Sequence, residues 1–201
     1  MQKLFVSRGF KLIRHSFQMA ITFDQSPTPI EQWPQGIRLK PLNVETDLAG
    51  IYRAHDEAFS DHFGHTDQPF EEGVRLFRHW MVDEEAFNPS LWFIAMDGDE
   101  VAGYSICKFS EQETPPIGWV TILGVRRPWR KHGLGNALLR HSFSEFNKRG
   151  VRKVGLAVDA SNLTGALRLY EKAGMTVAHQ FDRYEKELRP GKELMTTELS
   201  E

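Results

Sequence analysis

Residues 120–125 (VTILGV) and 130–137 (RKHGLGNA) decide the fold of this chain. The first segment has the apolar composition of a buried strand, and the second is a basic, glycine-containing loop that opens a helix. Gly133 and Gly135 let the backbone come close to a ligand, and the unpaired N–H groups at the helix start favour an anion. Positive charge beside them comes from Arg130, Lys131 and His132. The pattern predicts a pyrophosphate site.

A Gly-x-Gly loop alone is a weak signal, because many such loops mark only a turn or a close helix-strand contact. The sequence lacks the Gly-x-x-x-x-Gly-Lys-Ser/Thr motif of nucleoside-triphosphatases, and Arg140 stands near the place of the third glycine of a dinucleotide fingerprint. A second block, DASNLTGALRLYEKAGM at 159–175, follows a predicted strand and makes the first block far more specific.

Together the two blocks resemble the GNAT superfamily of N-acetyltransferases, and the resemblance covers about Ile37 to Leu188. The segment 130–135 looks like the Arg-x-x-Gly-x-Gly pyrophosphate loop of that family. The second block matches at Asn162, Ala166, Leu169, Tyr170 and Gly174. A narrower likeness to tandem-domain members such as mycothiol synthase rests on the predicted strand at 17–23, which precedes the domain.

The resemblance implies an α/β fold of the GNAT type, with a mixed, mostly antiparallel sheet of six to seven strands, a central splayed parallel pair and helices on both faces. It implies acetyl-CoA as co-substrate, with the pantetheine arm between the splayed strands and Gly124 easing a bulge there. The cofactor-binding residues that it implies are Leu123, Val125, Arg130, Lys131, His132, Gly133, Leu134, Gly135, Asn136, Asn162, Ala166 and Tyr170.

The resemblance gives catalytic roles to Tyr170 and Asn162. Asn162 would contact the pantetheine arm, and the Tyr170 hydroxyl would lie near the sulfur and protonate the departing thiolate. A phenol has an ordinary pKa of about 10, above that of a thiol, so the driving force for this proton transfer is modest. Many relatives carry a carboxylate on the central strand, whereas Trp119, Val120 and Thr121 occupy that region here.

The general base therefore stays unassigned. Candidates are Glu111, Glu113, His62 and His65, or a chain of water molecules. The acceptor site is expected in the loop 60–69 together with the segment after the third predicted strand. The aromatic and acidic side chains of the loop suit a polar, cationic small molecule. No metal site is expected, because the histidines have no matching acid or cysteine spacing.

Hydrophobic periodicity and turn residues predict the other elements. Strands are expected at 37–42, 91–96, 101–109, 118–125 and 153–158, with one or two more within 176–188. Helices are expected at 46–59, 70–82, 133–149 and 163–173. The strand-helix-strand order over 118–158 implies a parallel pair at the centre of the sheet.

The chain divides into four parts: a helix turn and strand at 1–24, a proline-rich linker at 25–35, the acetyltransferase domain at 36–188 and a polar tail at 189–201. Apolar residues at every second position from Phe17 to Phe23 predict a strand rather than an amphipathic transit peptide. LFVSRGF at 4–10 resembles LYEKAGM at 169–175, so the first part is interpreted as the remnant of a preceding domain of the same fold. Its strand is expected to pair within the chain or with a second copy in a homodimer.

Composition argues against several partners. A net charge of −2 gives no overall positive field for nucleic acid. No apolar run approaches the ~18–20 residues that cross a bilayer, so no membrane partner is expected. The single cysteine, Cys107, lies in an apolar stretch and forms no disulfide framework, which fits a reducing compartment such as the cytoplasm.

These observations predict an enzyme, an N-acetyltransferase that moves an acetyl group from acetyl-CoA directly to an amine of a small molecule. Two alternatives stay open. One is acetylation of a protein N-terminus or lysine, which needs an open groove for a peptide. The other is a CoA-binding module of a tandem protein, without turnover. The acceptor, the acyl-chain preference and the oligomeric state do not follow from the sequence.

Overall fold

The structure is a computed structural model that describes residues 2–24, 33–109, 116–161 and 165–191. Seven strands form one sheet: β1 (Lys11–Thr22), β2 (Ile37–Lys40), β3 (Trp92–Asp97), β4 (Glu100–Phe109), β5 (Ile117–Val125), β6 (Lys153–Asp159) and β7 (Thr176–Glu185). Their order is β2-β3-β4-β5-β6-β1-β7. Among the described neighbours, β5 and β6 are parallel and the other pairs antiparallel. The predicted mixed sheet with a central parallel pair is confirmed.

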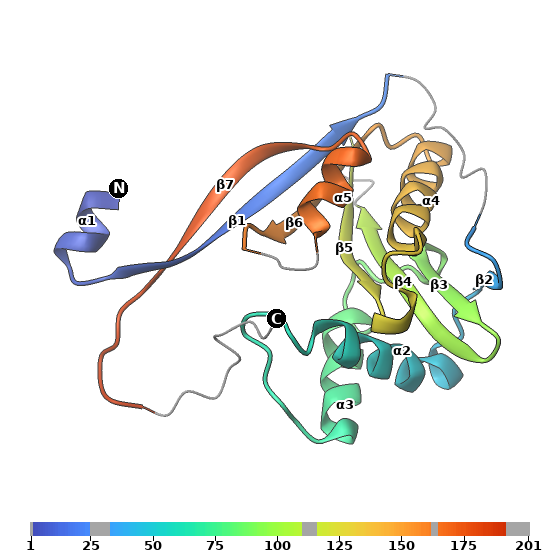
Figure 1. Ribbon diagram of the computed structural model, residues 1–201, viewed down its shortest axis with the longest axis horizontal. Helices are drawn as coiled ribbons and strands as arrows, with labels where there is room; N and C mark the ends of the chain where they lie inside the picture. Colours follow the sequence, from blue (N-terminus) through green and yellow to red (C-terminus); the bar gives the residue numbers. More distant parts are fainter. Residues whose placement is uncertain (1, 25–32, 110–115, 162–164, 192–201) are drawn as a thin grey trace.

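Four of the five helices in the described residues cover the two faces of this sheet (Figure 1). The five are α1 (Gln2–Ser7), α2 (Val44–Phe59), α3 (Phe70–Met81), α4 (Leu134–Lys148) and α5 (Ala166–Lys172), with 3-10 turns η1 (Pro89–Leu91) and η2 (Arg127–Trp129). Figure 1 shows α4 and α5 on one side of the sheet and α2 and α3 on the other. α2 begins after Asn43, because the Asn43 side chain accepts a hydrogen bond from the Glu45 amide and so caps the first turn.

Each face of the sheet has its own apolar core. The core under α4 and α5 includes Leu138, Phe146, Val154, Leu156 and Met175. The core under α2 and α3 includes Ile51, Tyr52, Phe77, Trp92 and Ile94. Burial of apolar surface stabilises a fold by roughly 25 cal/mol per Å². The two cores therefore hold the middle of the sheet as a fixed layer between the helices.

The parallel strands β5 and β6 pair for only a few residues and then separate. Their register runs from Ile117 opposite Lys153 to Val120 opposite Leu156. Beyond that point β5 pairs with β4, and β6 pairs with β1. Two strand edges therefore face each other across a gap without pairing, which is the splayed arrangement that the sequence predicts.

A bulge in β5 lies at the start of this gap. The register of β4 and β5 shifts between Ile106 and Cys107 and leaves Thr121 as the extra residue. The prediction that Gly124 eases the bulge is therefore wrong, because Gly124 lies in register opposite Tyr104. A Cβ at Gly124 would lie 2.8 Å from Cε1 of Tyr104, so glycine is needed there to admit the tyrosine ring.

The N-terminal strand β1 is paired along both edges, with β6 on one side and β7 on the other. Of the two predicted arrangements, the structure has the one within the chain. β1 begins at Lys11, six residues before the predicted start at Phe17. The early part was missed because Lys11 and His15 stand at the positions where the alternation of Phe17, Met19 and Ile21 calls for apolar residues.

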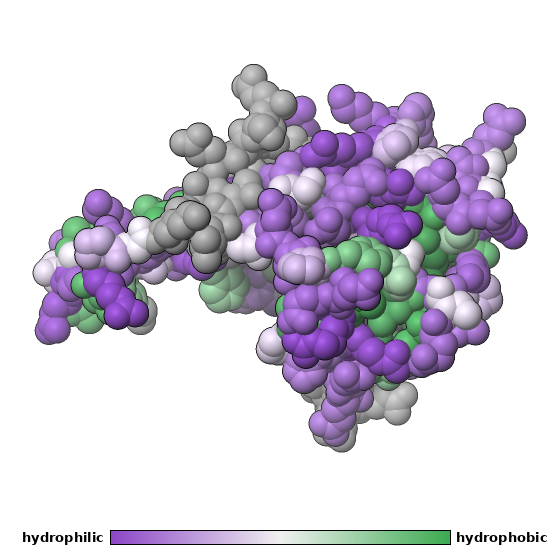
Figure 2. Space-filling model, turned by 90° about the horizontal axis from the view of Figure 1, so that it is seen from below, coloured by the Kyte–Doolittle hydropathy of each residue, from purple (hydrophilic) through white to green (hydrophobic). Residues whose placement is uncertain are grey.

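Beyond the core, β1 and β7 continue as a two-stranded ribbon that projects from the molecule and carries α1 at its far end (Figure 1). The predicted one or two final strands are thus a single strand, β7. The ribbon and α1 expose several apolar side chains, and hydrophobic surface is visible on the projecting end in Figure 2. On the projecting part these side chains are Leu4, Val6 and Leu12, while Val177 and Phe181 are exposed on β7 where β1 still pairs with β6.

The likeness between residues 4–10 and 169–175 extends to the backbone. α1 and α5 are each followed by a glycine with positive φ, 79° at Gly9 and 95° at Gly174. In both, the amide after the glycine donates to the carbonyl five residues earlier at 3.0 Å, from Phe10 to Phe5 and from Met175 to Tyr170. Both helices therefore end in the same glycine-dependent turn and lead into a strand.

Candidate active site

A cavity of about 910 Å³ lies between the separated ends of β5 and β6. Its wall is built from residues 120–125 of β5, the end of β6, the start of α4, the start of α5 and the end of α2. A volume of this size is within the range of about 300–1,000 Å³ that is common for small-molecule sites. The gap in the sheet is therefore the first place to look for chemistry.

One end of the cavity is the start of α4. Gly133, just before the helix, has a φ of 85°, and no side chain of the described residues caps the first turn. The amide of Ala137 donates to the Gly133 carbonyl at 3.0 Å, which is the first bond of the helix. The amides of Leu134, Gly135 and Asn136 precede that bond and remain for a ligand, with the positive end of the helix dipole behind them.

The three predicted basic residues beside this helix start have different surroundings. Lys131 lines the cavity, and its φ of 66° makes it the one non-glycine residue in the described ranges with positive φ. Arg130 also lines the cavity, but its guanidinium donates to the carbonyls of Val125 at 3.1 Å and Ala58 at 3.0 Å. His132 is exposed and lies outside the cavity wall. Of these three residues, Lys131 is therefore the one on the cavity wall whose side chain has no hydrogen bond or ion pair among the described residues.

Tyr170 lies on the wall of the same cavity. The side chain is buried, and burial raises the pKa of Tyr170 to about 12. Its hydroxyl therefore keeps its proton at neutral pH and can donate a hydrogen bond. Other predicted ligands on this wall are Leu123, Val125, Gly135, Asn136 and Ala166. The Leu134 side chain is buried in the core beneath α4, and Asn162 lies outside the described residues.

The predicted acceptor loop and the last turn of α2 supply Phe59, Asp61 and His62 to the wall. Asp61 Oδ1 is buried and has no hydrogen-bond partner among the described residues, while Oδ2 lies 3.5 Å from Arg130. Burial lowers the pKa of His62, although the nearby Asp61 opposes this effect. This end of the cavity thus offers an unpaired carboxylate oxygen and a neutral imidazole.

The candidates for the general base do not all reach the cavity. His62 lines it, whereas His65 lies outside its wall, 3.4 Å from the Asp67 carboxylate. Glu111 and Glu113 lie outside the described residues. Among the candidates that the structure describes, His62 is the one placed to take a proton from a ligand.

The N-terminal strand also reaches this end of the cavity. Arg14 of β1 donates from Nε to Asp159, which lines the cavity at the end of β6. Its guanidinium also lies 4.3 Å from the ring centroid of Phe63, in the acceptor loop, while Arg183 of β7 is 5.8 Å from that centroid. The ribbon therefore holds the end of β6 and the acceptor loop together.

Three polar residues of the wall are not among the predicted site residues: His55, Thr121 and Asp159. His55 stands at a position that continues the apolar spacing of α2, and that pattern predicts a buried residue rather than a site residue. Thr121 was noted only as a residue at the place of the missing carboxylate. Its Oγ1 is buried and has no hydrogen-bond partner among the described residues. Periodicity gives the buried face, but a cavity wall and a packed core produce the same pattern.

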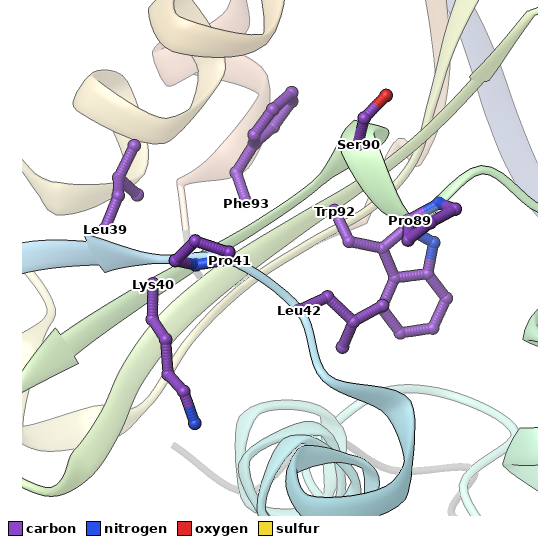
Figure 3. Close-up of a pocket in the computed structure, with 8 residues that line it drawn as sticks. All are labelled: Leu39, Lys40, Pro41, Leu42, Pro89, Ser90, Trp92 and Phe93. Carbon is purple, nitrogen blue, oxygen red and sulfur yellow. The ribbon is translucent and has the colours of Figure 1, made fainter.

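A second cavity, of about 420 Å³, lies where β2 leads into α2 and η1 leads into β3 (Figure 3). Its wall is mostly apolar, with Leu39, Leu42 and Trp92 among its residues. Lys40 points away from the Trp92 ring in Figure 3 and donates to Asp47 at 2.5 Å. This cavity therefore offers no free charged group for catalysis.

Three further observations concern groups outside the first cavity. Cys107 is buried, and burial raises its pKa to about 11, so it is a core thiol. In the described ranges, no cluster of three or more His, Cys, Asp or Glu side chains is placed to hold a metal ion. None of the helices described is long and apolar enough to cross a membrane.

Comparison with protein families gives one match, a model described as the acetyltransferase (GNAT) family, over residues 48–175. Among curated proteins, the mycothiol acetyltransferase of Thermobispora bispora is 31% identical over 154 residues, which is 75% of this chain and 50% of that protein. The mycothiol acetyltransferase of Nocardia farcinica is 29% identical over 177 residues, which is 85% of this chain and 55% of that protein. The chain spans about half the length of these curated relatives.

Solved structures show the same likeness. A GCN5-related N-acetyltransferase from Sphaerobacter thermophilus is 36% identical with a TM-score of 0.77, over 96% of this chain and 57% of that one. A tandem GNAT protein from the clavulanic acid biosynthesis pathway is 14% identical with a TM-score of 0.70, over 95% of this chain and 59% of that one. At that identity the second likeness concerns the fold alone.

Proposed function

The chain belongs to the acetyltransferase (GNAT) family, and on that premise we propose that it transfers an acetyl group from acetyl-CoA to an amine of a small molecule. The observation that carries the proposal is one cavity that joins the uncapped amides of α4 to Tyr170 along the unpaired edges of β5 and β6. A diphosphate fits the amides, and an extended arm fits the strand edges. The thioester then lies toward Tyr170.

The binding of acetyl-CoA follows from the contacts around the start of α4. The amides of Leu134, Gly135 and Asn136 hold the pyrophosphate, and Lys131 adds charge to them. Arg130 is engaged by two backbone carbonyls, so its role is to fix the end of β5 against α2. His132 is exposed and adds charge from outside the wall. The β5 backbone at Leu123 and Val125, with Ala166 and Asn162, contacts the pantetheine arm.

Tyr170 stabilises the leaving thiolate chiefly as a hydrogen-bond donor. With its pKa raised to about 12, the buried phenol is a weaker acid than a thiol, whose ordinary pKa is about 8.5. Complete proton transfer from the phenol to the thiolate is therefore uphill. A hydrogen bond that strengthens as charge develops on sulfur still lowers the barrier.

The acceptor amine binds at the other wall. Asp61 Oδ1 is a buried acceptor without a partner in the described ranges, and such an atom suits an ammonium or amine N–H. His62 is neutral because burial lowers its pKa, so it can accept the proton that the amine loses on attack. The buried position of Asp61 Oδ1 favours a small amine that can reach this oxygen at the cavity wall.

Release of free thiol from acetyl-CoA over a panel of small amines tests the proposal. We expect Tyr170→Phe to lower kcat by about a hundredfold, because it removes a donor aimed at developing charge. Retention of CoA in native mass spectrometry should not change. In the same assay His62→Gln should lower kcat, whereas His65→Gln, outside the wall, should not.

Tyr184→Phe is the matched control, because Tyr184 lies on β7 and stacks on Phe5 at 5.0 Å, away from the cavity. It should keep wild-type turnover. Binding of CoA without thiol release on any amine would identify a CoA-binding module instead, and failure to bind CoA would refute the proposal.

A further inference from the structure

Three aromatic side chains form one wall of the cavity. His55, Phe59 and His62 are spaced so that they follow one face of α2 and the turn after it, and all three line the cavity. The ring centroids of His55 and Phe59 are 4.8 Å apart, and those of Phe59 and His62 are 4.6 Å apart. This wall is rigid, because each ring packs against the next.

His55 is also tied to the sheet by a hydrogen bond of 2.7 Å between its Nδ1 and the Tyr104 hydroxyl. Tyr104 lies on β4 and is 1% exposed, with its ring in the space that Gly124 leaves by lacking a Cβ. Burial raises the pKa of Tyr104 well above its ordinary value, so the hydroxyl keeps its hydrogen. Nδ1 of His55 is the one acceptor that the described residues offer to this buried hydroxyl, so the O–H donates to Nδ1 and no buried hydrogen is left unpaired.

The hydrogen-bond network therefore decides the tautomer of His55. Burial lowers the pKa of His55 to about 4, so the ring is neutral at pH 7 and carries a single N–H. Because Nδ1 accepts from Tyr104, that N–H is at Nε2. Phe59 and Phe77 flank the ring, with centroids at 4.8 and 5.1 Å. His55 thus brings one fixed donor to a wall that is otherwise apolar beside it.

We propose that the Nε2–H of His55 binds an oxygen of the acceptor, so that the site prefers amines with a hydroxyl or carbonyl oxygen near the nitrogen. The inference rests on the proposed function, because it names the class of acceptor for the same cavity. Asp61 and His62 accept hydrogen bonds from the amine, whereas His55 donates one. A simple alkylamine leaves that donor without a partner, which costs affinity.

Two amines of the same shape test the inference. 1-Amino-2-propanol and isobutylamine differ by a hydroxyl in place of a methyl group, and isothermal titration in the presence of CoA gives a Kd for each. Wild-type protein should bind the hydroxyl amine about tenfold more tightly. His55→Phe should bind the two equally. Tyr104→Phe should reduce the preference, because Tyr104 positions the ring without touching the ligand.

His79→Phe is the control, since His79 is exposed on α3 beside Trp80 and lies outside the cavity wall. It should keep the tenfold preference. His55→Phe leaves the buried Tyr104 hydroxyl without its partner, so the double variant His55→Phe, Tyr104→Phe is measured beside it and should also show equal binding.

Measurements of binding and of turnover distinguish the proposed acceptor preference from the proposed acetyl transfer. Equal binding of both amines to wild type, binding of neither, or an unchanged preference in His55→Phe would overturn the inference. Thiol release on both amines at equal efficiency would leave the acetyltransferase standing. A His55-dependent binding preference without thiol release on either amine would support the inference and count against acetyl transfer.

Discussion

Burial keeps several imidazoles of this protein uncharged at neutral pH. The pKa values of His55, His62 and His141 are all lowered, in each case chiefly because the ring has lost contact with water. For the two histidines on the cavity wall, this neutrality is useful: a charged imidazole would repel an ammonium group that approaches Asp61.

The same burial makes stability depend on pH. The unfolded chain protonates His55 near pH 6.5, whereas the folded protein does so near pH 4. Between these values the unfolded state binds more protons than the folded state. The contribution of His55 to the free energy of unfolding is therefore complete above pH 6.5 and decreases by about 3 kcal/mol as the pH falls to 4. Chemical denaturation at pH 7.0 and pH 4.5 measures the fall.

His55→Gln should lose a clear part of this pH dependence, because glutamine does not titrate. A carboxylate with a lowered pKa, such as Asp47, keeps its contribution above its ordinary value of 3.8 and loses it as pH falls through its folded pKa, below the chosen window. An identical fall in wild type and His55→Gln between pH 7.0 and 4.5 would show that His55 is not the group responsible.

Single residues of the site were predictable where chemistry requires one residue type. Gly133 needs a positive φ, and Tyr170 stands in a block with a fixed spacing, so both stand out in the sequence. His55 and Thr121 did not stand out, because their positions fit the periodicity of a buried helix face and a buried strand. Only packing shows that these faces border a cavity.

At the scale of elements, the loop before α4 shows which glycine is needed for conformation. Gly133 has a φ of 85°, a region that costs an alanine about 1 kcal/mol or more. Gly135 lies inside the helix, and a Cβ there would meet only Leu169 and Val125 side-chain atoms at 3.7 Å, which is ordinary contact.

We expect Gly133→Ala to weaken CoA binding by tenfold or more and to lower the melting temperature, because relief of the strain moves the amides of Leu134 to Asn136. Gly135→Ala should stabilise α4 by up to about 1 kcal/mol. Titration calorimetry of Gly133→Ala and thermal denaturation of both variants measure this. Unchanged CoA binding by Gly133→Ala would count against the proposed amide site.

The strands and helices of the domain were mostly predictable, since their apolar periods are long and turn residues separate them. The two errors have a common physical origin. β1 was predicted too short and the bulge was placed at Gly124 instead of Thr121, because both depend on which strand lies alongside. That the first segment is the ending of a preceding domain stays a prediction, supported by the matching ends of α1 and α5.

At the scale of the whole molecule, β1 is the strand that joins β7 to the rest of the sheet. In the described residues, β7 pairs with β1, and β6 pairs with β1 along its length. We expect a variant without residues 1–24 to aggregate or to lose cooperative thermal unfolding, because it exposes one edge of β6 and leaves β7, already at the edge of the sheet, without any partner strand.

A shorter deletion is the matched control. Removal of residues 1–9 takes away α1 and leaves β1 in place, so the sheet should stay intact and CoA binding should be kept. Size-exclusion chromatography and thermal denaturation compare the two variants. A monomer of unchanged melting temperature after loss of residues 1–24 would mean that β1 is dispensable for the fold.

The position of β1 also affects how the protein is made. Its partners in β6 and β7 lie well over a hundred residues later along the chain. At translation rates of about 5–20 residues per second, β1 leaves the ribosome on the order of ten seconds before the strands that flank it. During that interval β1 has neither of the strands that flank it in the folded protein, so its apolar side chains stay exposed until β6 and β7 emerge.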